Sequence, residues 1–192
     1  MKYIVILLLS LFAYNVNTNT AAKQQLIIVI PETKQTVEEL VYDCYYNVGK
    51  RLISDNLINI SADQFATYAT IVAYCESELN PKSNKLDQQG IAQITKDTRK
   101  SLGIASMNNM SIEEQINSHE KFFRKCSKKA LKLIHSSTDF HALNFAPSRM
   151  HKTKLSDVTN KYLAALDFNK DNIITRDDLY LYQTKKVKSN KY

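Results

Sequence analysis

Apolar and polar residues follow one another along most of the chain with the spacing of helices that bury one face. From residue 37 to residue 53, apolar positions recur every three or four residues, which predicts a first helix starting after Thr36. A second apolar run, 65–79, has the same period and predicts a second helix. This helix should end at Asn80-Pro81, because the residue before a proline is driven out of the helical region.

Paired capping residues mark where two of the predicted helices begin. Ser61 and Gln64 stand three residues apart, and so do Ser111 and Glu114. In each pair the first side chain can accept from the backbone of the second residue, while the second side chain bonds back. We therefore expect the second helix to begin after Ser61, and another helix to run from Ser111 to about Lys129.

Shorter helical patterns lie between and after these helices. Residues 95–102 predict a short helix with Gly103 as its C-terminal cap, and Thr138 or Asp139 can cap a further helix. The polar segment 82–89 predicts an exposed loop. With no tryptophan, three glycines and this many helical patterns, the chain is predicted to be mainly α rather than a β-barrel with many tight turns.

The second predicted helix carries a carboxylic acid inside its apolar stripe. On a helical wheel Glu76 shares a narrow sector with Val72 and Leu79, whereas Glu78 points away from it. Burial and the nearby negative end of the helix dipole both favour the protonated acid. A protonated carboxylic acid near neutral pH is what a general acid requires. A buried, hydrogen-bonded glutamate with a purely structural role is the alternative on Glu76 alone.

The residues that follow Glu76 resemble a known family. In order they read Glu-Ser, Asn-Pro, Gly-Ile-Ala-Gln-Ile-Thr, Thr and Leu-Gly, at residues 76–77, 80–81, 90–95, 98 and 102–103. This order is similar to that of the lytic transglycosylases, a goose-type lysozyme-like family, over about thirty contiguous residues. The resemblance implies a lysozyme-like helical domain with a small loop or hairpin at its cleft. It also implies that Glu76 is the catalytic acid and base, that Ser77 supports it beside the substrate, and that Gln93 lines the sugar-binding cleft.

The activity implied by this resemblance is cleavage of the β-1,4 bond between N-acetylmuramic acid and N-acetylglucosamine in peptidoglycan glycan strands. Glu76 would protonate the glycosidic oxygen and then accept a proton from the muramyl C6 hydroxyl, which leaves a 1,6-anhydro product. A hydrolytic lysozyme of inverting type would instead need a second carboxylate to activate water. Asp87, in the polar loop, is the best candidate for that role, with a solvated loop residue as the alternative. A catalytically inactive protein that only binds peptidoglycan is a further alternative.

One later segment departs from the family pattern. Residues 143–149 stand where the family has a Tyr-Asn-Ala-Gly-Pro-like sequence, and Asn144 and Pro147 match it. The resemblance therefore implies that Asn144 binds substrate. Leu143 replaces the tyrosine that normally contacts the catalytic glutamate, so an inactive site is the corresponding alternative. The same residues also fit a helix end with a proline stop.

A calcium-loop pattern lies near the C-terminus. Hard oxygen donors recur at the spacing of a twelve-residue loop that coils around one ion. The predicted ligands are Asp167, Asn169, Asp171, the backbone carbonyl of Ile173, Thr175 and Asp178. Asn172 replaces the usual glycine, and Asp178 replaces a longer glutamate. The loop resembles an EF-hand, and we expect structural Ca²⁺ there and no cofactor for catalysis. An acidic turn that caps two helices is the alternative.

The chain is expected to divide into four parts. Residues 1–22 combine an early lysine, a short apolar run and small residues, which is typical of a secretory signal peptide. We expect an arm at 23–36, the lysozyme-like transglycosylase domain at 37–158, and the calcium loop with a basic tail at 159–192. The protein is therefore expected to be exported to the periplasm, the cell envelope, the medium or a virion. Membrane contact is expected only through the N-terminal segment, if it stays uncleaved.

The formal net charge of +7 is consistent with an anionic partner, although much of the excess lies in two local runs, 121–132 and 185–191, which are more often solvated faces or tails. No nucleic-acid-binding motif accompanies this charge, so nucleic acid is not expected as a partner. Attraction to an anionic cell wall is the simpler interpretation.

The cysteines give little support to a thiol enzyme. Three of them are an odd number for an oxidising compartment, and the sequence leaves open a Cys44–Cys126 or a Cys75–Cys126 bridge. No CxxC occurs, and no motif supports a Cys/His protease.

Overall fold

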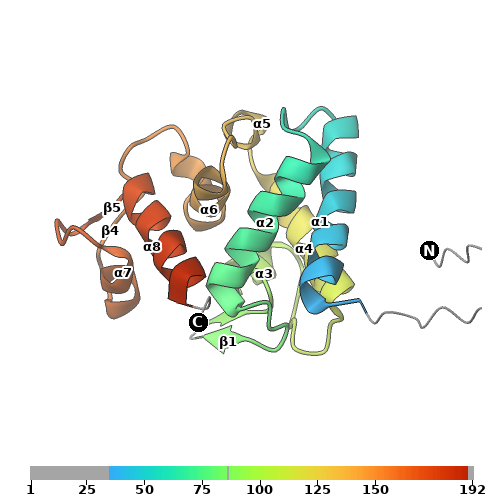
Figure 1. Cartoon of the computed structure of the whole chain (residues 1–192), viewed down its shortest axis with the longest axis horizontal. Helices are drawn as coiled ribbons and strands as arrows, with labels where there is room; N and C mark the ends of the chain where they lie inside the picture. Colours follow the sequence, from blue (N-terminus) through green and yellow to red (C-terminus); the bar gives the residue numbers. More distant parts are fainter. Residues whose placement is uncertain (1–34, 86, 190–192) are drawn as a thin grey trace, which may run out of the picture. The chain divides into compact units, whose positions relative to one another are not determined.

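The structure is a computed structural model that describes residues 35–85 and 87–189. This part of the chain is mainly α, as predicted, with 58% helix against 7% strand (Figure 1). The predicted signal peptide, residues 1–22, and nearly all of the predicted arm lie outside the described residues. Within the described ranges, no helix combines the length and the apolar character needed to cross a bilayer.

Two long helices pack against each other at the start of the fold. α1 (Val37–Ser54) and α2 (Ala62–Ser77) each begin at a capping box, and Ser61 and Gln64 form the second one as predicted. The helices approach closely at Gly49, where an added Cβ would lie 3.2 Å from the Cβ of Phe65. A larger residue at this position would therefore push the two helices apart.

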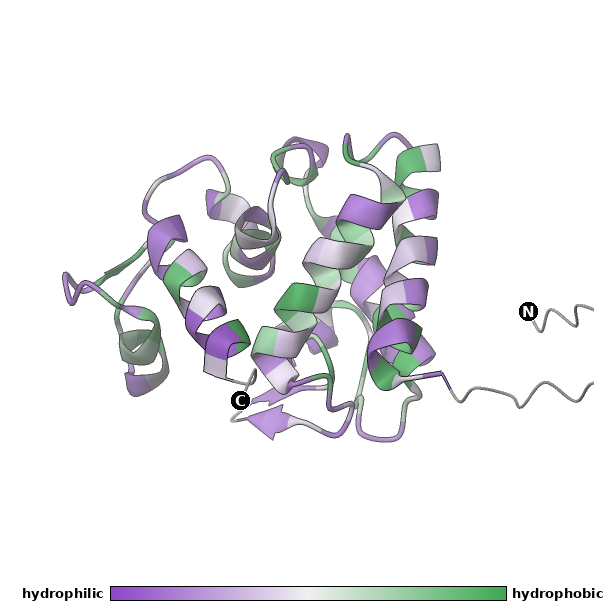
Figure 2. Cartoon of the chain, in the orientation of Figure 1, coloured by the Kyte–Doolittle hydropathy of each residue, from purple (hydrophilic) through white to green (hydrophobic). Residues whose placement is uncertain are grey.

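α2 is enclosed by other helices along most of its length. It packs against α1, α6 and α8, and Figure 2 shows few strongly hydrophilic residues along it. The helix ends at Ser77, before the predicted stop at Pro81. Glu78 adopts the left-handed conformation, with φ 55°, and its N–H donates to the carbonyl of Tyr74. The C-terminal end of α2 is thus closed by its own cap rather than by the proline.

An aromatic cluster lies at the centre of the core. The ring of Phe65 makes edge-to-face contacts with those of Tyr45, Phe123 and Phe140, at centroid distances of 5.2 to 6.5 Å. All four side chains are fully buried. These contacts connect α1, α2, α4 and α6, and pairs of this geometry stabilise a core beyond their area alone.

A small antiparallel sheet follows α2, and its first two strands lie in the segment 82–89, where a polar loop or small hairpin is predicted. Its strands are β1 (Asn84–Lys85), β2 (Gln88–Gln89) and β3 (Ile94–Thr95), in the order β1-β2-β3. The register pairs Asn84 with Gln89, and Gln88 with Thr95. Thr95 then caps the short helix α3 (Lys96–Ser101), as predicted.

The middle of the chain forms three helices where the sequence predicts two. α4 (Ile112–Lys125) begins at its predicted capping box but stops at Cys126, whose backbone is extended. Ser127 then caps a separate short helix, α5 (Lys128–Leu131), so the prediction of one helix to Lys129 was wrong.

The next helix begins earlier than predicted. α6 (Ser137–Phe145) is capped by Ser136, whose hydroxyl accepts from the N–H of Asp139. The predicted caps, Thr138 and Asp139, therefore lie inside the helix. A 3₁₀ turn, η1 (Pro147–Arg149), follows α6 at the predicted proline stop.

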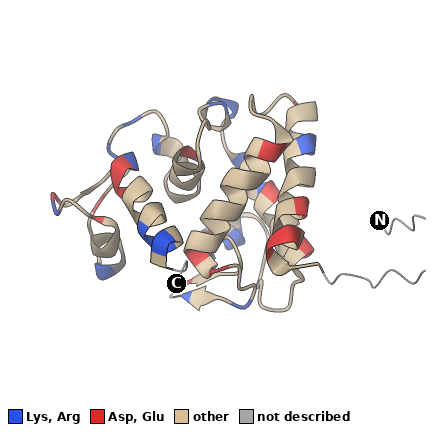
Figure 3. Ribbon diagram, viewed as in Figure 1, with Lys and Arg blue, Asp and Glu red and all other residues tan. Residues whose placement is uncertain are grey.

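The C-terminal part of the described chain packs back against α2 and α6. It consists of β4 (Ser156–Asp157), α7 (Lys161–Leu166), β5 (Ile173–Ile174) and α8 (Arg176–Ser189). β4 and β5 form an antiparallel pair, and α8 packs against both α2 and α6. Acidic residues lie in the first turn of α8 and lysines in its last turn, which suits the helix dipole (Figure 3). The described residues 35–85 and 87–189 belong to one compact unit, and this unit includes the predicted calcium loop.

Candidate active site

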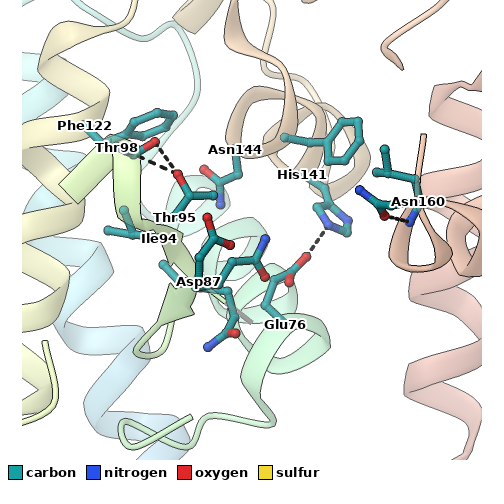
Figure 4. A pocket seen from close by; sticks show the side chains of 14 residues that line it. Glu76, Asp87, Ile94, Thr95, Thr98, Phe122, His141, Asn144 and Asn160 are labelled. Atoms are coloured by element: carbon teal, nitrogen blue, oxygen red, sulfur yellow. Dashed lines mark hydrogen bonds and ion pairs between the residues drawn. The ribbon is translucent and has the colours of Figure 1, made fainter. Parts of the chain in front are cut away.

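A cleft of about 270 Å³ opens at the C-terminal end of α2. Residues of α2, the small sheet, α4, α6 and α7 line it (Figure 4). Four residues predicted to act on or bind substrate lie on its wall, namely Glu76, Asp87, Gln93 and Asn144. The structure therefore brings together residues that lie between positions 76 and 144 of the sequence.

Glu76 lies in the last turn of α2, at the edge of the cleft. Its residue exposure is 9%, so it is nearly buried while still lining the cleft. Its Oε1 atom forms a 2.7 Å hydrogen bond with Nε2 of His141, which Figure 4 shows across the cleft wall. A carboxyl held in one orientation at the edge of a cavity suits proton transfer to a bound group.

The backbone on either side of Glu76 is held by two other elements. The Tyr182 hydroxyl, from α8, donates to the carbonyl oxygen of Cys75 at 3.1 Å. The ammonium group of Lys85, from β1, donates to the carbonyl oxygen of Glu76 at 2.8 Å. Carbonyl groups in the last turn of a helix lack partners within the helix. These two hydrogen bonds satisfy the carbonyl oxygens of Cys75 and Glu76 and hold the backbone of Glu76 in position beside the cleft.

His141 is the site residue that the sequence did not reveal. The resemblance described above singles out Leu143, which is fully buried in the core. Residues three apart lie on the same face of a helix, so His141 and Asn144 both face the cleft while Leu143 turns inward. A contact to Glu76 is thus present, but it comes from His141, two positions before the leucine. The His-x-x-Asn spacing was the only local signal for it.

Asn144 is oriented by a buried chain of hydrogen bonds. Its Oδ1 lies 3.1 Å from Nε2 of His119, whose Nδ1 lies 2.9 Å from the hydroxyl of Tyr45. Burial lowers the pKa of His119 to about 4 and raises that of Tyr45, so both are neutral at neutral pH. The Nδ2 atom of Asn144 is buried and has no hydrogen-bond partner among the described residues. Asn144 therefore lines the cleft and carries a buried amide donor without a partner among the described residues.

Within the described residues, Gln93 has an unpaired hydrogen-bond acceptor, whereas Asn144 has an unpaired donor. Its Nε2 donates to the carbonyl oxygens of Gly90 and Ser83, at 2.7 and 3.2 Å. Its Oε1 is buried and has no hydrogen-bond partner in the described part of the chain. The residue is 5% exposed and has a left-handed backbone, with φ 48°. An acceptor buried without a partner is costly, which points to a ligand that supplies the donor.

Asp87 lies on the same cleft as Glu76, on the turn between β1 and β2. It is exposed, and the guanidinium group of Arg99 donates to its backbone carbonyl at 3.3 Å. Figure 4 shows its carboxylate on the cleft side of the turn. Asp87 is thus placed where a second carboxylate could meet a substrate or a water molecule.

Ser77 does not belong to the cleft wall, which corrects its prediction as a substrate-binding residue. Its side chain is buried, and its hydroxyl donates to the carbonyl oxygen of Ala73 at 2.9 Å. Serine hydroxyls inside helices commonly bond back in this way to the carbonyl four residues earlier. Ser77 contributes to the helix that carries Glu76 rather than to ligand contact.

The predicted calcium loop closes on itself through its aspartates. Asp167 accepts from the N–H groups of Asp171 and Asn172, at 3.2 and 2.9 Å. Asp178, which is 2% exposed, accepts from the N–H groups of Phe168 and Thr175, both within 3.0 Å. Carboxylate-to-backbone hydrogen bonds therefore tie the start of the loop to its middle, through Asp167, and its end to its start, through Asp178.

The backbone conformation of this loop is compatible with the predicted calcium ion, whereas its acidic side chains do not converge on one point. Asn172 adopts the left-handed conformation, with φ 63°, at the position where the usual loop has glycine. Asn169 donates to Asp171 at 3.0 Å, and Ile173 lies in the β4–β5 pair. Within the described residues, no three His, Cys, Asp or Glu side chains converge in a way that could hold a metal. The mixed oxygen donors fit calcium, and calcium binding stays a prediction.

The cysteines form no bridge. All three lie in the described part of the chain, and each carries a free thiol. Burial raises the pKa of Cys75 to about 12 and that of Cys126 to about 12. Thiols held protonated in this way are poor nucleophiles.

No protein-family model, no curated protein and no solved structure matches this chain. The resemblance seen in residues 76–103 therefore remains a hypothesis.

Proposed function

We propose that this protein is a peptidoglycan lytic transglycosylase that cleaves the β-1,4 bond between N-acetylmuramic acid and N-acetylglucosamine. The observation that carries the proposal is the nearly buried carboxyl of Glu76 at the edge of a cleft, hydrogen-bonded to His141 at 2.7 Å. A single positioned carboxyl is sufficient for this reaction, because the same group can act first as acid and then as base.

The unpaired polar atoms of the cleft support a sugar that carries an amide. An N-acetyl group has one N–H donor and one carbonyl acceptor. The buried Oε1 of Gln93 needs a donor, and the buried Nδ2 of Asn144 needs an acceptor. Both residues line the same cleft as Glu76, so an acetamido sugar bound there would satisfy both.

The proposed reaction has two proton transfers and no net water. Glu76, protonated, donates its proton to the glycosidic oxygen as the bond from that oxygen to the muramyl C1 breaks. The N-acetylglucosamine part leaves with a new hydroxyl. The muramyl C6 hydroxyl oxygen then bonds to C1, and its proton returns to the Glu76 carboxylate. The products are a 1,6-anhydromuramyl end and the original protonated enzyme.

Hydrolysis is the second candidate, and the position of Asp87 favours it. Asp87 lines the same cleft, and its carboxylate is exposed to solvent. In an inverting hydrolase a second carboxylate activates a water molecule on the opposite side of the sugar. Only the backbone of Asp87 is held by Arg99, so the carboxylate is not fixed for this role as Glu76 is.

An inactive peptidoglycan-binding protein is the third candidate. The substitution at Leu143 originally favoured it, because the family's glutamate contact would be lost. His141 supplies a contact of its own to Glu76, which removes that reason. We therefore keep catalysis as the proposal.

Calcium belongs to the proposal as a structural ion. Asp167, Asn169, Asp171, Thr175, Asp178 and the Ile173 carbonyl would hold it. When bound, the ion would neutralise the carboxylates of this loop and strengthen the link between α7 and α8. It takes no part in the proton transfers proposed for Glu76.

The proposed site of action is the cell envelope. Export would be directed by residues 1–22, with peptidoglycan glycan strands as the partner. The net charge of +7 would favour association with an anionic wall. We propose no nucleic-acid partner, and membrane contact only through an uncleaved N-terminal segment.

Mass spectrometry of peptidoglycan digested by the purified protein tests this function. We expect anhydromuropeptides from the wild type and their loss in Glu76→Gln, a change that keeps the size of the side chain and its contact to His141. Glu78→Gln is the matched control, since the Glu78 side chain is 58% exposed and should leave the products unchanged. Reducing-end products would instead support the hydrolase, and intact glycan with folded protein would support the binding protein.

A further inference from the structure

Gln183 connects the C-terminal helix to the residue that contacts Glu76. It lies on α8, is 5% exposed, and faces the first two turns of α6. Its Nε2 donates to the carbonyl oxygen of Ser137 at 3.1 Å and lies 3.3 Å from Nδ1 of His141. Its Oε1 accepts from the hydroxyl of Ser137 at 3.0 Å. The amide is therefore bonded at both ends.

These contacts determine which way the Gln183 amide points. A backbone carbonyl can only accept, so the group that faces the Ser137 carbonyl has to be the amide NH₂. The reversed amide would place two oxygens against each other. The same NH₂ group faces Nδ1 of His141, so Nδ1 has to be the acceptor in that contact.

The orientation of Gln183 in turn assigns the proton on His141. A neutral imidazole carries its hydrogen on one nitrogen and accepts at the other. With Nδ1 accepting, the hydrogen lies on Nε2 and is donated to Oε1 of Glu76. A hydrogen on Nδ1 would instead face the NH₂ group of Gln183.

We propose that Gln183 is a positioning residue that holds His141 as its neutral Nε2–H tautomer. Its consequence for catalysis rests on the proposed function. Oε1 of Glu76 can accept from Nε2–H whether the carboxyl is protonated or not. The proton exchanged with substrate is then carried by the other oxygen, Oε2, in both steps of the reaction. Helix α8, which follows the predicted calcium loop, thereby becomes part of the active site.

Imidazole nitrogen NMR of the ¹⁵N-labelled protein tests the tautomer without any assay of activity. Among the resonances of the four histidines, those of His141 are identified as the ones that are missing in His141→Asn. In the wild type we expect the Nδ1 resonance of His141 at the position of an acceptor nitrogen and the Nε2 resonance at that of a protonated one. Gln183→Glu, which places an acceptor against Nδ1, should move the Nδ1 resonance to the protonated position. A protonated Nδ1 in the wild type, or identical spectra in Gln183→Glu, overturns the proposal.

Kinetics of the same variants test the consequence for Glu76. Gln183→Glu should lower kcat about ten- to a hundred-fold with little change in KM, since the geometry of the acid is disturbed and not the sugar contacts. Gln183→Met keeps the volume and removes the donor, so it should show a smaller loss of kcat, with both tautomers in its spectrum. Lys188→Met, exposed on the same helix, should match the wild type.

The two proposals fail in different ways in these experiments. A wild-type protein that shows the expected tautomer and cleaves no glycan removes the proposed function and leaves the assignment of His141 intact. If the Gln183→Glu variant cleaves glycan as well as the wild type does and has the same spectrum, the role of Gln183 is excluded. The proposed function of Glu76 then remains intact.

Discussion

The Nε2 atom of His141 lies 2.7 Å from Oε1 of Glu76, although 65 positions separate the two residues in sequence. The contact joins the end of α2 to the second turn of α6, and both side chains are nearly or fully buried. A buried polar pair of this kind is costly to break, because each group left alone lacks its partner. The pair therefore connects the stability of this region to the orientation of the proposed acid.

Replacing His141 tests the importance of this pair for activity. His141→Phe keeps a ring in the space and removes the hydrogen bond, so Glu76 loses its fixed orientation. We expect kcat to fall by about a hundred-fold, the order of effect of a misplaced acid. Steady-state cleavage of purified glycan strands measures it. His141→Gln, which can still donate from its amide, should recover part of the loss; equal activity in His141→Phe and the wild type would show that the contact is only structural.

Replacing Asp87 separates the two proposed reactions. In a transglycosylase Asp87→Asn should keep the 1,6-anhydro products and change kcat by less than about tenfold, because no water has to be activated. In an inverting hydrolase the same change should abolish reducing-end products. Product analysis by mass spectrometry distinguishes the two. Asp97→Asn, a change in the first turn of α3 outside the cleft lining, is the control.

Asn144→Asp tests the proposed amide donor. The variant keeps an oxygen for His119 and replaces the unpaired Nδ2 by a second oxygen. We expect KM for N-acetylated glycan to rise about tenfold, the effect of losing one hydrogen bond of about 1.4 kcal/mol. Calorimetric titration with a chitin oligosaccharide measures binding directly. Unchanged affinity in a folded variant would mean that Asn144 does not contact the sugar.

The parts of the fold that were predicted correctly are those with local signals. Ser61 with Gln64 and Ser111 with Glu114 form the capping boxes that their spacing predicts. The break at Cys126 was missed because no glycine or proline marks it, and Ser127 restarts the helix at once. The strands of the small sheet are two residues long, which is too short for an alternating pattern to appear.

In the candidate site, too, a residue could be predicted where it had a local sequence signal. Glu76 could be found from its place in an apolar stripe, which is a property of one helix. His141 and Gln183 could not, because their roles depend on α6 and α8 meeting the end of α2. The resemblance to the lytic transglycosylases pointed to Leu143 instead, because matched positions in a sequence do not show which face of a helix turns to the cleft.

Calcium should stabilise the protein if the loop at 167–178 binds it. At a free concentration one hundred times Kd, the gain is about 2.7 kcal/mol, which corresponds to a rise in Tm of about 5–10 °C for a domain of this size. Asp171→Asn removes one proposed ligand charge and leaves the buried Asp167 and Asp178 in place, so it should reduce the rise and leave Tm in EDTA nearly unchanged. Differential scanning calorimetry with calcium, magnesium or EDTA measures these values. Identical melting in calcium and EDTA would favour the acidic turn.

His119 should make the fold sensitive to acid. Burial lowers its pKa from 6.5 to about 4, so as the pH falls the unfolded chain takes up the proton first. The stability that depends on neutral His119 is therefore complete above pH 6.5 and is lost progressively as the pH falls towards 4, by up to about 3 kcal/mol. His119→Gln cannot titrate, so its free energy of unfolding should fall less steeply over this range.

Urea denaturation at pH 7, 5.5 and 4 measures the difference between the wild type and His119→Gln. We expect the advantage of the wild type at pH 7 to shrink at each step, because only the wild type has to exclude a proton from the Tyr45–His119–Asn144 chain. His151→Gln changes an exposed histidine and should follow the wild type throughout. Parallel curves for wild type and His119→Gln would mean that the imidazole titrates alike in the folded and unfolded chains. The hydrogen bonds from Tyr45 through His119 to Asn144 would then tolerate a charged His119. A neutral His119 ring could then no longer be used to decide which atom of the Asn144 amide is the donor.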